Sequence, residues 1–266
     1  MRIGFLTHRP DHPLLTATAA LLTPRHQVEV IDPGASPPWP APSSSGHLDV
    51  CLLKARTPSA LALARSFEER GVPVLNSASA TGLCQDRTRM AELARSAGLP
   101  FAATRTAPSL GRLAVETGLG YPLVVKSRHS RRDDLVARVD DTSELTALCR
   151  TWSQEPVVTQ EFTPNSGWDH KLWVIGDQLF AGLRRSELAP EGRSPTLPLA
   201  PADLPNGWAE MARSVGSVFA LDVYGVDLIE TADGAPLVVD VNAFPGVRGQ
   251  SGAPHALAAL TLRAAA

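Results

Sequence analysis

Cysteine is scarce in this chain, and its few copies are poorly placed for cross-linking or for binding metal. The 266 residues include three cysteines, Cys51, Cys84 and Cys149, an odd number without the Cys-x-x-Cys spacing of zinc sites. The seven histidines show no metal-ligand spacing either. We therefore expect reduced thiols in a cytoplasmic protein, with neither a disulfide framework nor a zinc centre.

An excess of one charge and long apolar runs are also lacking. The chain has 25 Lys and Arg against 27 Asp and Glu, so its formal net charge of -2 argues against a nucleic-acid partner. No apolar run reaches the length of a membrane-spanning helix, and residues 1–10 are too polar for a signal peptide. We predict neither nucleic-acid nor membrane partners, and the oligomeric state stays open, a homo-oligomer included.

Signatures of covalent catalysis are missing as well. There is no Gly-x-Ser-x-Gly motif and no pairing of Cys with His that would mark a nucleophile. This favours a reaction in which side chains position substrates and neutralise charge.

The order of expected elements divides the chain into an α/β first part and an α+β remainder. Strands at residues 2–6, 28–31, 49–54 and 72–75 alternate with helices at 14–22 and 59–69, which is typical of a parallel sheet. A helix follows at 86–96, and from residue 121 the strands pair as antiparallel hairpins. Two Pro-rich stretches, 33–45 and 190–205, are expected loops.

The last hairpin, 225–231 and 236–241, carries the sharpest chemical signal. If Asp233 and Gly234 form a two-residue turn, Asp227 lies directly opposite Asp240, and Asn242 shares the face of Asp240. Opposed carboxylates repel, and a bound Mg²⁺ with its oxygen ligands would offset that repulsion. Two solvated acids, or two acids sharing one proton, are the alternative, because a one-residue slip breaks the opposition.

Around this hairpin the sequence resembles a known family. The run LDVYGVDLIETADGAPLVVDVNAFPGVRG at 221–249 is similar to the metal-binding end of the ATP-grasp fold, and most similar to the RimK-like carboxylate–amine ligases. Other matching pieces, in the family's order, are VPVLNSASA, DRTRMAELARSAGLP, YPLVVK, QEF and DHKLWVIGDQLFAGLRR. The resemblance implies an N-terminal parallel-sheet lobe at 1–85, a small central lobe at 86–165 and a C-terminal lobe at 166–266. The last two would clasp ATP between antiparallel sheets.

The resemblance also implies roles for single residues. Asp227, Asp240 and Asn242 would hold magnesium, as two ions or with Mn²⁺ in its place, between the β- and γ-phosphates of ATP. The other implied cofactor-binding residues are Arg87 and Lys126 at the phosphates, the backbone of Gln160, Glu161 and Phe162 at the adenine, and Asp169. Lys171 would face the transferring phosphoryl group.

One of two arginines would assist Lys171. Family alignment favours Arg185, whereas a two-residue turn at Gly176-Asp177 places Arg184 opposite Asp169 on the Lys171 face. The sequence leaves this choice open.

Two loops depart from the family pattern. The stretch after Lys126, Ser-Arg-His-Ser-Arg-Arg-Asp-Asp, has no glycine where the family has a glycine-rich phosphate loop. Its arginines, Arg128 to Arg132, either replace the backbone amides, recognise an anionic co-substrate or form a solvated charged run. The stretch 187–205 lacks the family's acceptor-site segment.

The predicted reaction is an ATP-dependent ligation of a carboxylate to an amine of amino-acid or peptide type, through an acyl phosphate, with release of ADP and phosphate. The alternative is an ATP-grasp kinase that phosphorylates a polyol or inositol-phosphate-like hydroxyl. A nucleotide-binding module without catalysis is a third reading. Lys54 and Arg56 are candidates for the acceptor site.

Overall fold

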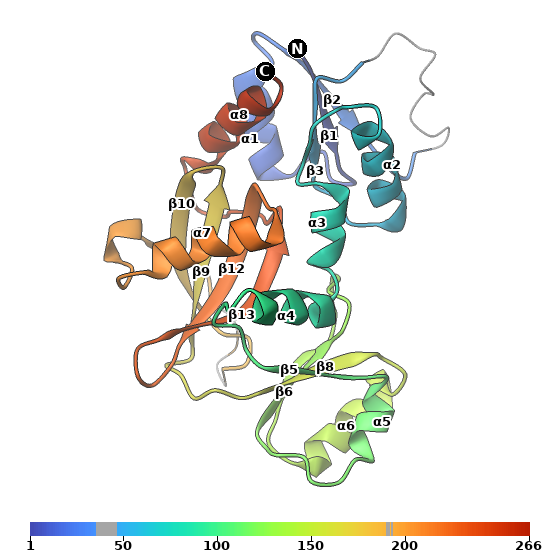
Figure 1. Ribbon diagram of the computed structural model, residues 1–266, viewed down its shortest axis with the longest axis vertical. Coiled ribbons are helices and arrows are strands. Elements are labelled where there is room, and N and C mark those ends of the chain that lie inside the picture. The colour runs from blue at the N-terminus through green and yellow to red at the C-terminus, as the bar shows by residue number, and fades with distance from the viewer. Residues whose placement is uncertain (36–46, 190–191, 193) are drawn as a thin grey trace.

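The computed structural model describes residues 1–35, 47–189, 192 and 194–266, in which three sheets follow one another along the chain (Figure 1). Most of the Pro-rich loop expected at 33–45 lies outside these residues. All three cysteines are free, as expected. None of the helices in the described ranges is long and apolar enough to cross a membrane.

The N-terminal sheet is parallel, as its sequence pattern predicts. Its strands are β1 (Arg2–Leu6), β2 (Gln27–Ile31), β3 (Val50–Leu53) and β4 (Val74–Leu75), in the order β2-β1-β3-β4. β1 and β3 are nearly continuous buried apolar runs, which suits strands covered on both faces by the helices α1 (Pro13–Leu22) and α2 (Pro58–Glu68). Because β2 lies on one side of β1 and β3 on the other, the strand order reverses between β1 and β3.

The middle sheet is antiparallel, in the order β5-β8-β6-β7. Its strands are β5 (Thr104–Ala107), β6 (Leu123–Ser127), β7 (Val136–Val139) and β8 (Val157–Glu161), and its helices are α5 (Leu110–Ala114) and α6 (Thr142–Trp152). The chain enters it through α3 (Ala78–Leu83) and α4 (Arg87–Ser96). The sequence pattern missed α3, β5 and α5, which are short and gain their order from packing against neighbours.

The C-terminal sheet is the largest, with the order β11-β10-β9-β12-β13. Its strands are β9 (Trp168–Ile175), β10 (Gln178–Arg185), β11 (Leu197–Leu199), β12 (Val223–Glu230) and β13 (Pro236–Ala243), and α7 (Trp208–Phe219) packs on it. The expectation of a plain loop at 190–205 is wrong, because β11 and a 3₁₀ turn (Pro201–Asp203) lie within it. Pro198 is tolerated in β11 because this strand forms the edge of the sheet.

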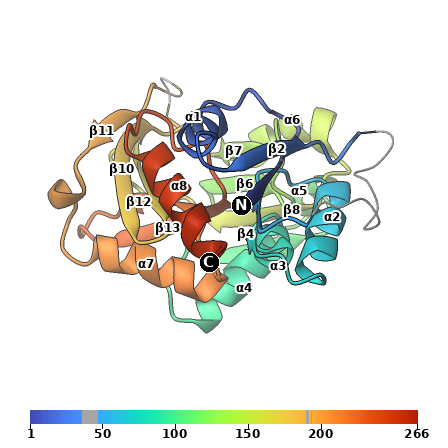
Figure 2. The ribbon, with the colours of Figure 1, turned by 90° about the horizontal axis from the view of Figure 1, so that it is seen from above.

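The C-terminal helix packs against the first helix of the chain. α8 (Ala253–Ala264) packs beside α1, as both views of the ribbon show (Figures 1 and 2). One apolar core contains Phe5 of the N-terminal sheet, Trp173 and Val223 of the C-terminal sheet and Leu257 of α8. This shared core holds the N-terminal sheet against the C-terminal sheet.

Candidate active site

The carboxylate pair stands where the sequence predicts it, although the turn differs from the expectation. Asp227 pairs directly with Asp240, and Asn242 pairs with Gly225 on the same face. The turn is not the expected two-residue one: Thr231 N–H donates to Ala235 C=O (3.0 Å) around a three-residue loop that ends at Gly234, with φ +81°.

A β-bulge restores the register that the longer turn would otherwise shift. Leu228 pairs with Val238, but the next pair is Asp227 with Asp240, so Val239 is an extra residue on β13. The longer turn and the bulge cancel each other's shift in register. The predicted opposition of Asp227 and Asp240 is therefore confirmed, although the count along the strands included neither feature.

A chain of opposite charges crosses the sheet beside this pair. The Nζ of Lys171 on β9 lies 2.8 Å from Asp227 and 3.2 Å from Asp169. The three residues share a face because Lys171 pairs with Asp227 across strands and Asp169 lies two residues away. Lys171 and Asp169 are buried, and 22% of the Asp227 side chain is exposed. Lys171 therefore offsets the negative charge of two carboxylates in a partly buried site.

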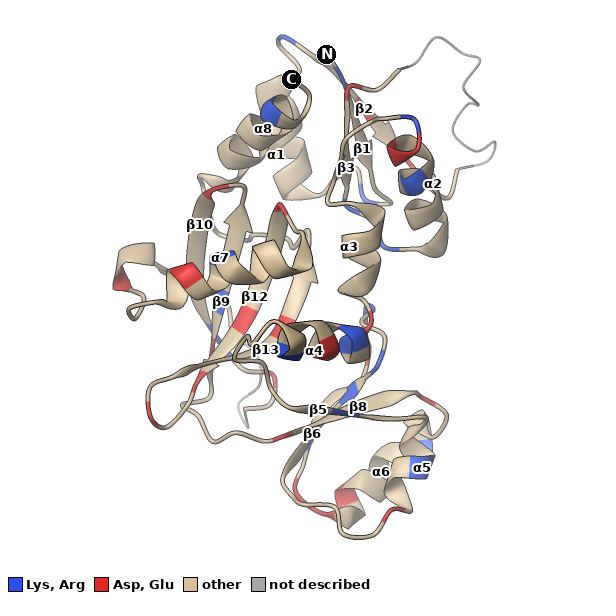
Figure 3. Ribbon diagram, in the orientation of Figure 1, with Lys and Arg blue, Asp and Glu red and all other residues tan. Residues whose placement is uncertain are grey.

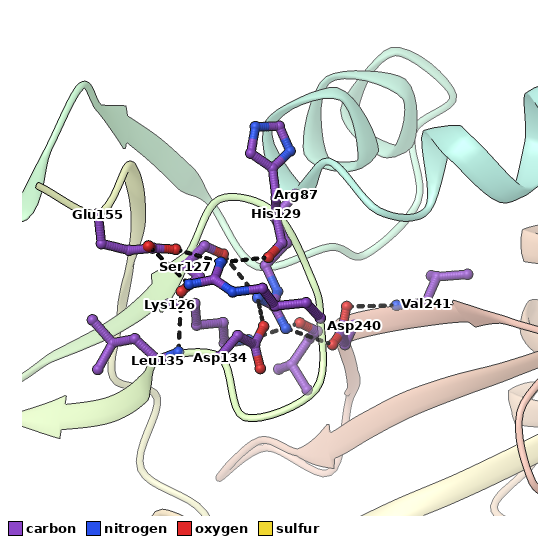
Figure 4. A network of polar contacts seen from close by, with 11 residues as sticks. Arg87, Lys126, Ser127, His129, Asp134, Leu135, Glu155, Asp240 and Val241 are labelled. Atoms are coloured by element: carbon purple, nitrogen blue, oxygen red, sulfur yellow. Dashed lines mark hydrogen bonds and ion pairs between the residues drawn. The ribbon is translucent and has the colours of Figure 1, made fainter. Parts of the chain in front are cut away.

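Arg87 offsets the second carboxylate from the opposite side of the cavity. As the first residue of α4, it is held by the N-cap Asp86, whose carboxylate accepts the N–H groups of Thr88 and Arg89. Its guanidinium donates to Asp134 (2.7 Å) and to the Ser127 carbonyl (2.8 Å), and lies 3.4 Å from Asp240 (Figure 4). Burial lowers the pKa of Arg87, but Asp240 and Asp134 outweigh it and keep the pKa above its usual value.

Lys126 forms a hydrogen bond with the bulged residue of β13. Its buried ammonium donates to the carbonyl of Val239, the extra residue on β13, at 2.9 Å. Burial lowers the pKa of Lys126 against the opposing pull of Asp240, its strongest favourable charge. The bulge thus anchors a cation of the middle sheet to the strand that carries Asp240.

All these side chains border one cavity of about 730 Å³ between the middle and C-terminal sheets. Each of the twelve residues implied for ATP, magnesium and phosphoryl transfer lines it: Arg87, Lys126, Gln160, Glu161, Phe162, Asp169, Lys171, Arg184, Arg185, Asp227, Asp240 and Asn242. The sequence reasoning missed its apolar wall, which includes Val124, Ile229, Leu237 and the bulged Val239. A mixed cavity of this size suits a ligand with a flat apolar part and a charged part.

Two of the three residues expected at the adenine already use polar groups inside the protein. The Gln160 side chain is buried and donates to the Thr104 hydroxyl (3.0 Å), and Phe162 N–H already donates to Pro122 C=O (3.1 Å). β5 begins opposite Gln160, so β8 runs one residue past it. The backbone groups of Glu161 that point away from β6 therefore face no neighbouring strand.

The two candidate arginines differ in their surroundings. Arg184 pairs with Asp169 across β9 and β10, which confirms the register expected from a turn at Gly176-Asp177. The Arg185 guanidinium lies 5.0 Å from the ring centre of Trp168. Both line the cavity, but Arg184 also lines a second cavity next to it. Arg184 therefore stands between the two.

The glycine-free loop after Lys126 is held by its own arginines. Arg128 forms two hydrogen bonds with Asp86 (3.0 and 2.7 Å), and Arg131 forms two with Glu155 (2.6 and 2.9 Å). Ser130 N–H donates to Gln85 C=O (2.8 Å). Bidentate pairs hold the side chains of Arg128 and Arg131, but Arg131 and Arg132 are 46% and 90% exposed, so a solvated charged run remains one of the three readings of this loop.

The donor set at the carboxylate pair fits a hard divalent cation. Two carboxylates on one face, 22% and 17% exposed toward the cavity, stand beside the amide of Asn242. Mg²⁺ commonly takes one or two carboxylates and completes its shell with phosphate oxygens and water. The described residues contain no group of three or more His, Cys, Asp or Glu that could hold a metal alone.

Comparison with known proteins agrees with this geometry. Residues 101–257 match the family described as the RimK-like ATP-grasp domain. The "Probable alpha-L-glutamate ligase 2" of Hahella chejuensis (strain KCTC 2396) is 30% identical over 201 residues, which cover 71% of this chain and 64% of that protein.

Solved structures share the fold over nearly the whole chain. A RimK domain ATP-grasp protein from Sphaerobacter thermophilus DSM 20745 is 25% identical, with a TM-score of 0.77 over 98% of this chain and 100% of that one. The ATP-grasp ligase PsnB, solved with a phosphomimetic variant of its minimal precursor, Mg and ADP, is 18% identical, with a TM-score of 0.71 over 99% and 98% of the two chains. The proteins named here for an activity are ligases, which leaves the kinase alternative without support.

The fold expected from the sequence is confirmed, and the chain belongs to the RimK-like ATP-grasp family.

Proposed function

We propose that this protein is an ATP- and Mg²⁺-dependent ligase that joins a carboxylate to an amine of amino-acid or peptide type. The observation that carries the proposal is the opposition of Asp227 and Asp240 in one cavity with Lys171, Arg87 and Lys126. Acids and bases alternate there as a polyphosphate with its metal requires: oxygen ligands for the cation, and fixed positive charge for the phosphate oxygens.

In the first step an oxygen of the substrate carboxylate attacks the γ-phosphorus of ATP. The bond between that phosphorus and the β,γ-bridging oxygen breaks, so ADP leaves and an acyl phosphate forms. Lys171 and Arg184 would neutralise the charge of the moving phosphoryl group, with Arg185 the alternative to Arg184. Lys126 and Arg87 would hold the phosphates that stay on ADP.

In the second step the amine nitrogen attacks the acyl carbon. The carbon–oxygen bond to phosphate breaks, the amine loses a proton, and an amide and inorganic phosphate are released. No side-chain nucleophile is needed, which agrees with the lack of such a motif in the sequence.

The remaining roles follow the cavity walls. Glu161, with the backbone of Gln160 and Phe162, would border the adenine, and Val124, Ile229 and Leu237 would cover its faces. Asp227, Asp240 and Asn242 would hold magnesium, as two ions or with Mn²⁺ in its place, which supplies positive charge to the phosphate oxygens. We also propose boundaries near residues 85 and 165 for three lobes, with α8 packed back on the first.

A screen for ADP release tests the proposal. Amino acids and amines form one panel and polyols the other, each with Mg-ATP and with hydroxylamine as a trap. A ligase gives ADP, and a hydroxamate from its acyl phosphate. Formation of AMP, or ADP release with polyols and no hydroxamate, would overturn the proposal.

A further inference from the structure

A second cavity opens beside the first, on the side of the N-terminal sheet. Its volume is about 1000 Å³. The residues that it shares with the first cavity, which we propose for the nucleotide, are Arg56, Ser130, Arg131, Lys171, Arg184, Asp227 and Asn242. A molecule in it would therefore reach the residues assigned to the transferring phosphoryl group. This proximity makes it the place for a substrate of the proposed ligase.

Its far wall comes from the carboxyl ends of parallel strands. Arg9 follows β1, and Lys54 and Arg56 follow β3 directly. The strand order reverses between these two strands, and open α/β sheets commonly bind ligands at such a reversal. Arg248, after β13, completes the wall. Figure 3 shows Lys and Arg positions in the loops that follow β1 and β3.

The positive charge of this wall has no counterpart in the described part of the protein. Arg9, Arg56 and Arg248 form no ion pair with any described residue, and the Lys54 ammonium donates only to the Phe244 carbonyl (2.6 Å). Among the described residues that line the cavity, Asp227 is the one carboxylate, and Lys171 already pairs with it.

Burial is the largest cause of a lowered pKa at two groups of this cavity, and mutual repulsion of the cations adds to it. Burial, together with the charges of Arg56, Arg9 and Arg248, lowers the pKa of Lys54 to about 8. Burial and the charges of Lys54, Arg9 and Arg248 lower the pKa of the neighbouring His12 to about 4. A bound anion would relieve both effects.

We propose that Arg9, Lys54, Arg56 and Arg248 bind an acidic group of a substrate, additional to the carboxylate or amine that reacts. The inference rests on the proposed ligase function and names its substrate class: a compound with a second carboxylate or a phosphate. Arginine forks fit the oxygens of either group, and Lys54 adds a point charge. The four residues are thus determinants of specificity and take no part in bond making.

Matched pairs of compounds test the inference: glutamate against glutamine, aspartate against asparagine, and phosphoserine against serine. With Mg-ATP and an amine panel, the acidic member should show a kcat/KM at least about tenfold higher than its neutral partner. The pair with the largest ratio tells a carboxylate from a phosphate. Equal use of acidic and neutral members would overturn the inference and leave the ligase proposal standing.

Variants of the wall connect this preference to the named residues. Arg9→Gln and Arg248→Gln should each raise the KM for the acidic substrate about tenfold and leave the KM for ATP unchanged. Arg150→Gln removes an equal charge from the exposed face of α6 and serves as the matched control. An unchanged KM in both wall variants would contradict the assignment.

Binding without turnover separates the two proposals. Acidic probes at millimolar concentration should raise the Tm of the wild-type protein, their neutral partners should not, and Arg248→Gln should lose the shift. Such a shift without ADP release would keep the anion site and remove the ligase. No shift with any acidic probe would likewise overturn the anion site.

Discussion

The two adjoining cavities differ in whether their charged side chains form ion pairs. In the first cavity, which we propose for the nucleotide, cations and carboxylates face one another, with Arg87 2.7 Å from Asp134 and Lys171 2.8 Å from Asp227. In the second cavity, Arg9, Lys54, Arg56 and Arg248 have no such partners among the described residues. The first site is balanced by the protein itself, whereas the second needs an anion from outside. We therefore expect that removal of one charge from the first cavity lowers stability, because its partner is left uncompensated, and that removal of one charge from the second does not.

The largest effect is expected on the balanced side. Asp240→Asn keeps the size of the side chain but removes a negative charge from the proposed magnesium site. We expect kcat/KM for ADP release to fall about a thousandfold, equivalent to about 4 kcal/mol, while the fold is retained. Asp233→Asn, in the exposed turn of the same hairpin, is the control. Activity equal to wild type would remove Asp240 from the metal site.

A stability measurement tests the balance directly. Arg87→Leu leaves the carboxylates of Asp134 and Asp240 without their shared cation, in a setting where the side chains are only 12% and 17% exposed. The free energy of unfolding in urea should fall by about 3 kcal/mol, since removal of one partner leaves a buried charge uncompensated. Adding Asp134→Leu should recover part of the loss. If Asp134→Leu lowers the stability of the Arg87→Leu variant as much as it lowers that of the wild-type protein, the two residues are not coupled.

Proton binding by Lys54 tests the unbalanced side. Its pKa of about 8 in the folded chain lies below the 10.5 of an unperturbed lysine, so between these pH values the unfolded chain binds more protons. Stability from this group therefore rises with pH from about 8 to 10.5. The difference in unfolding free energy between wild type and Lys54→Met should shift in favour of wild type over that range, measured in urea at successive pH values. A constant difference would contradict the shifted pKa.

The smallest expected effect is the change in stability when one cation of the second cavity is removed. Arg248→Gln removes one of the mutually repelling charges and should raise the free energy of unfolding of the ligand-free protein by about 0.5 kcal/mol at low salt. The gain should vanish near 1 M salt, where the Debye length is about 3 Å. Arg150→Gln should change stability less. A loss of stability in Arg248→Gln would mean that a partner balances this charge.

Much of the nucleotide cavity could be predicted because its residues sit at fixed intervals on strands. Asp240 and Asn242 alternate on one face, and so do Asp169 and Lys171. Period-two alternation survives small errors in strand ends, and the order of motifs carries the family resemblance. The position of Asp227 opposite Asp240 was predicted from the wrong turn, and the bulge at Val239 corrected it. A bulge depends on contacts made by the finished sheet, here with Lys126, which local sequence does not report.

The second cavity was hardly accessible to sequence reasoning. Lys54 and Arg56 were named as candidates, but Arg9 and Arg248, which lie 239 residues apart along the chain, carried no local signal. They meet because α8 packs on α1 and the shared core draws the N-terminal sheet against the C-terminal one. The ion pairs of Arg128 with Asp86 and of Arg131 with Glu155 were not predicted from the sequence for the same reason.

By itself, the sequence determined the family and the parallel and antiparallel halves, and it predicted twelve of the residues that line the first cavity, because these follow from local periodicity and from motifs in a fixed order. Only the tertiary structure decided which charges are paired and which are left facing an open cavity. Coulomb energies depend on separation in space and on burial, and neither quantity is written in the spacing of residues along a chain.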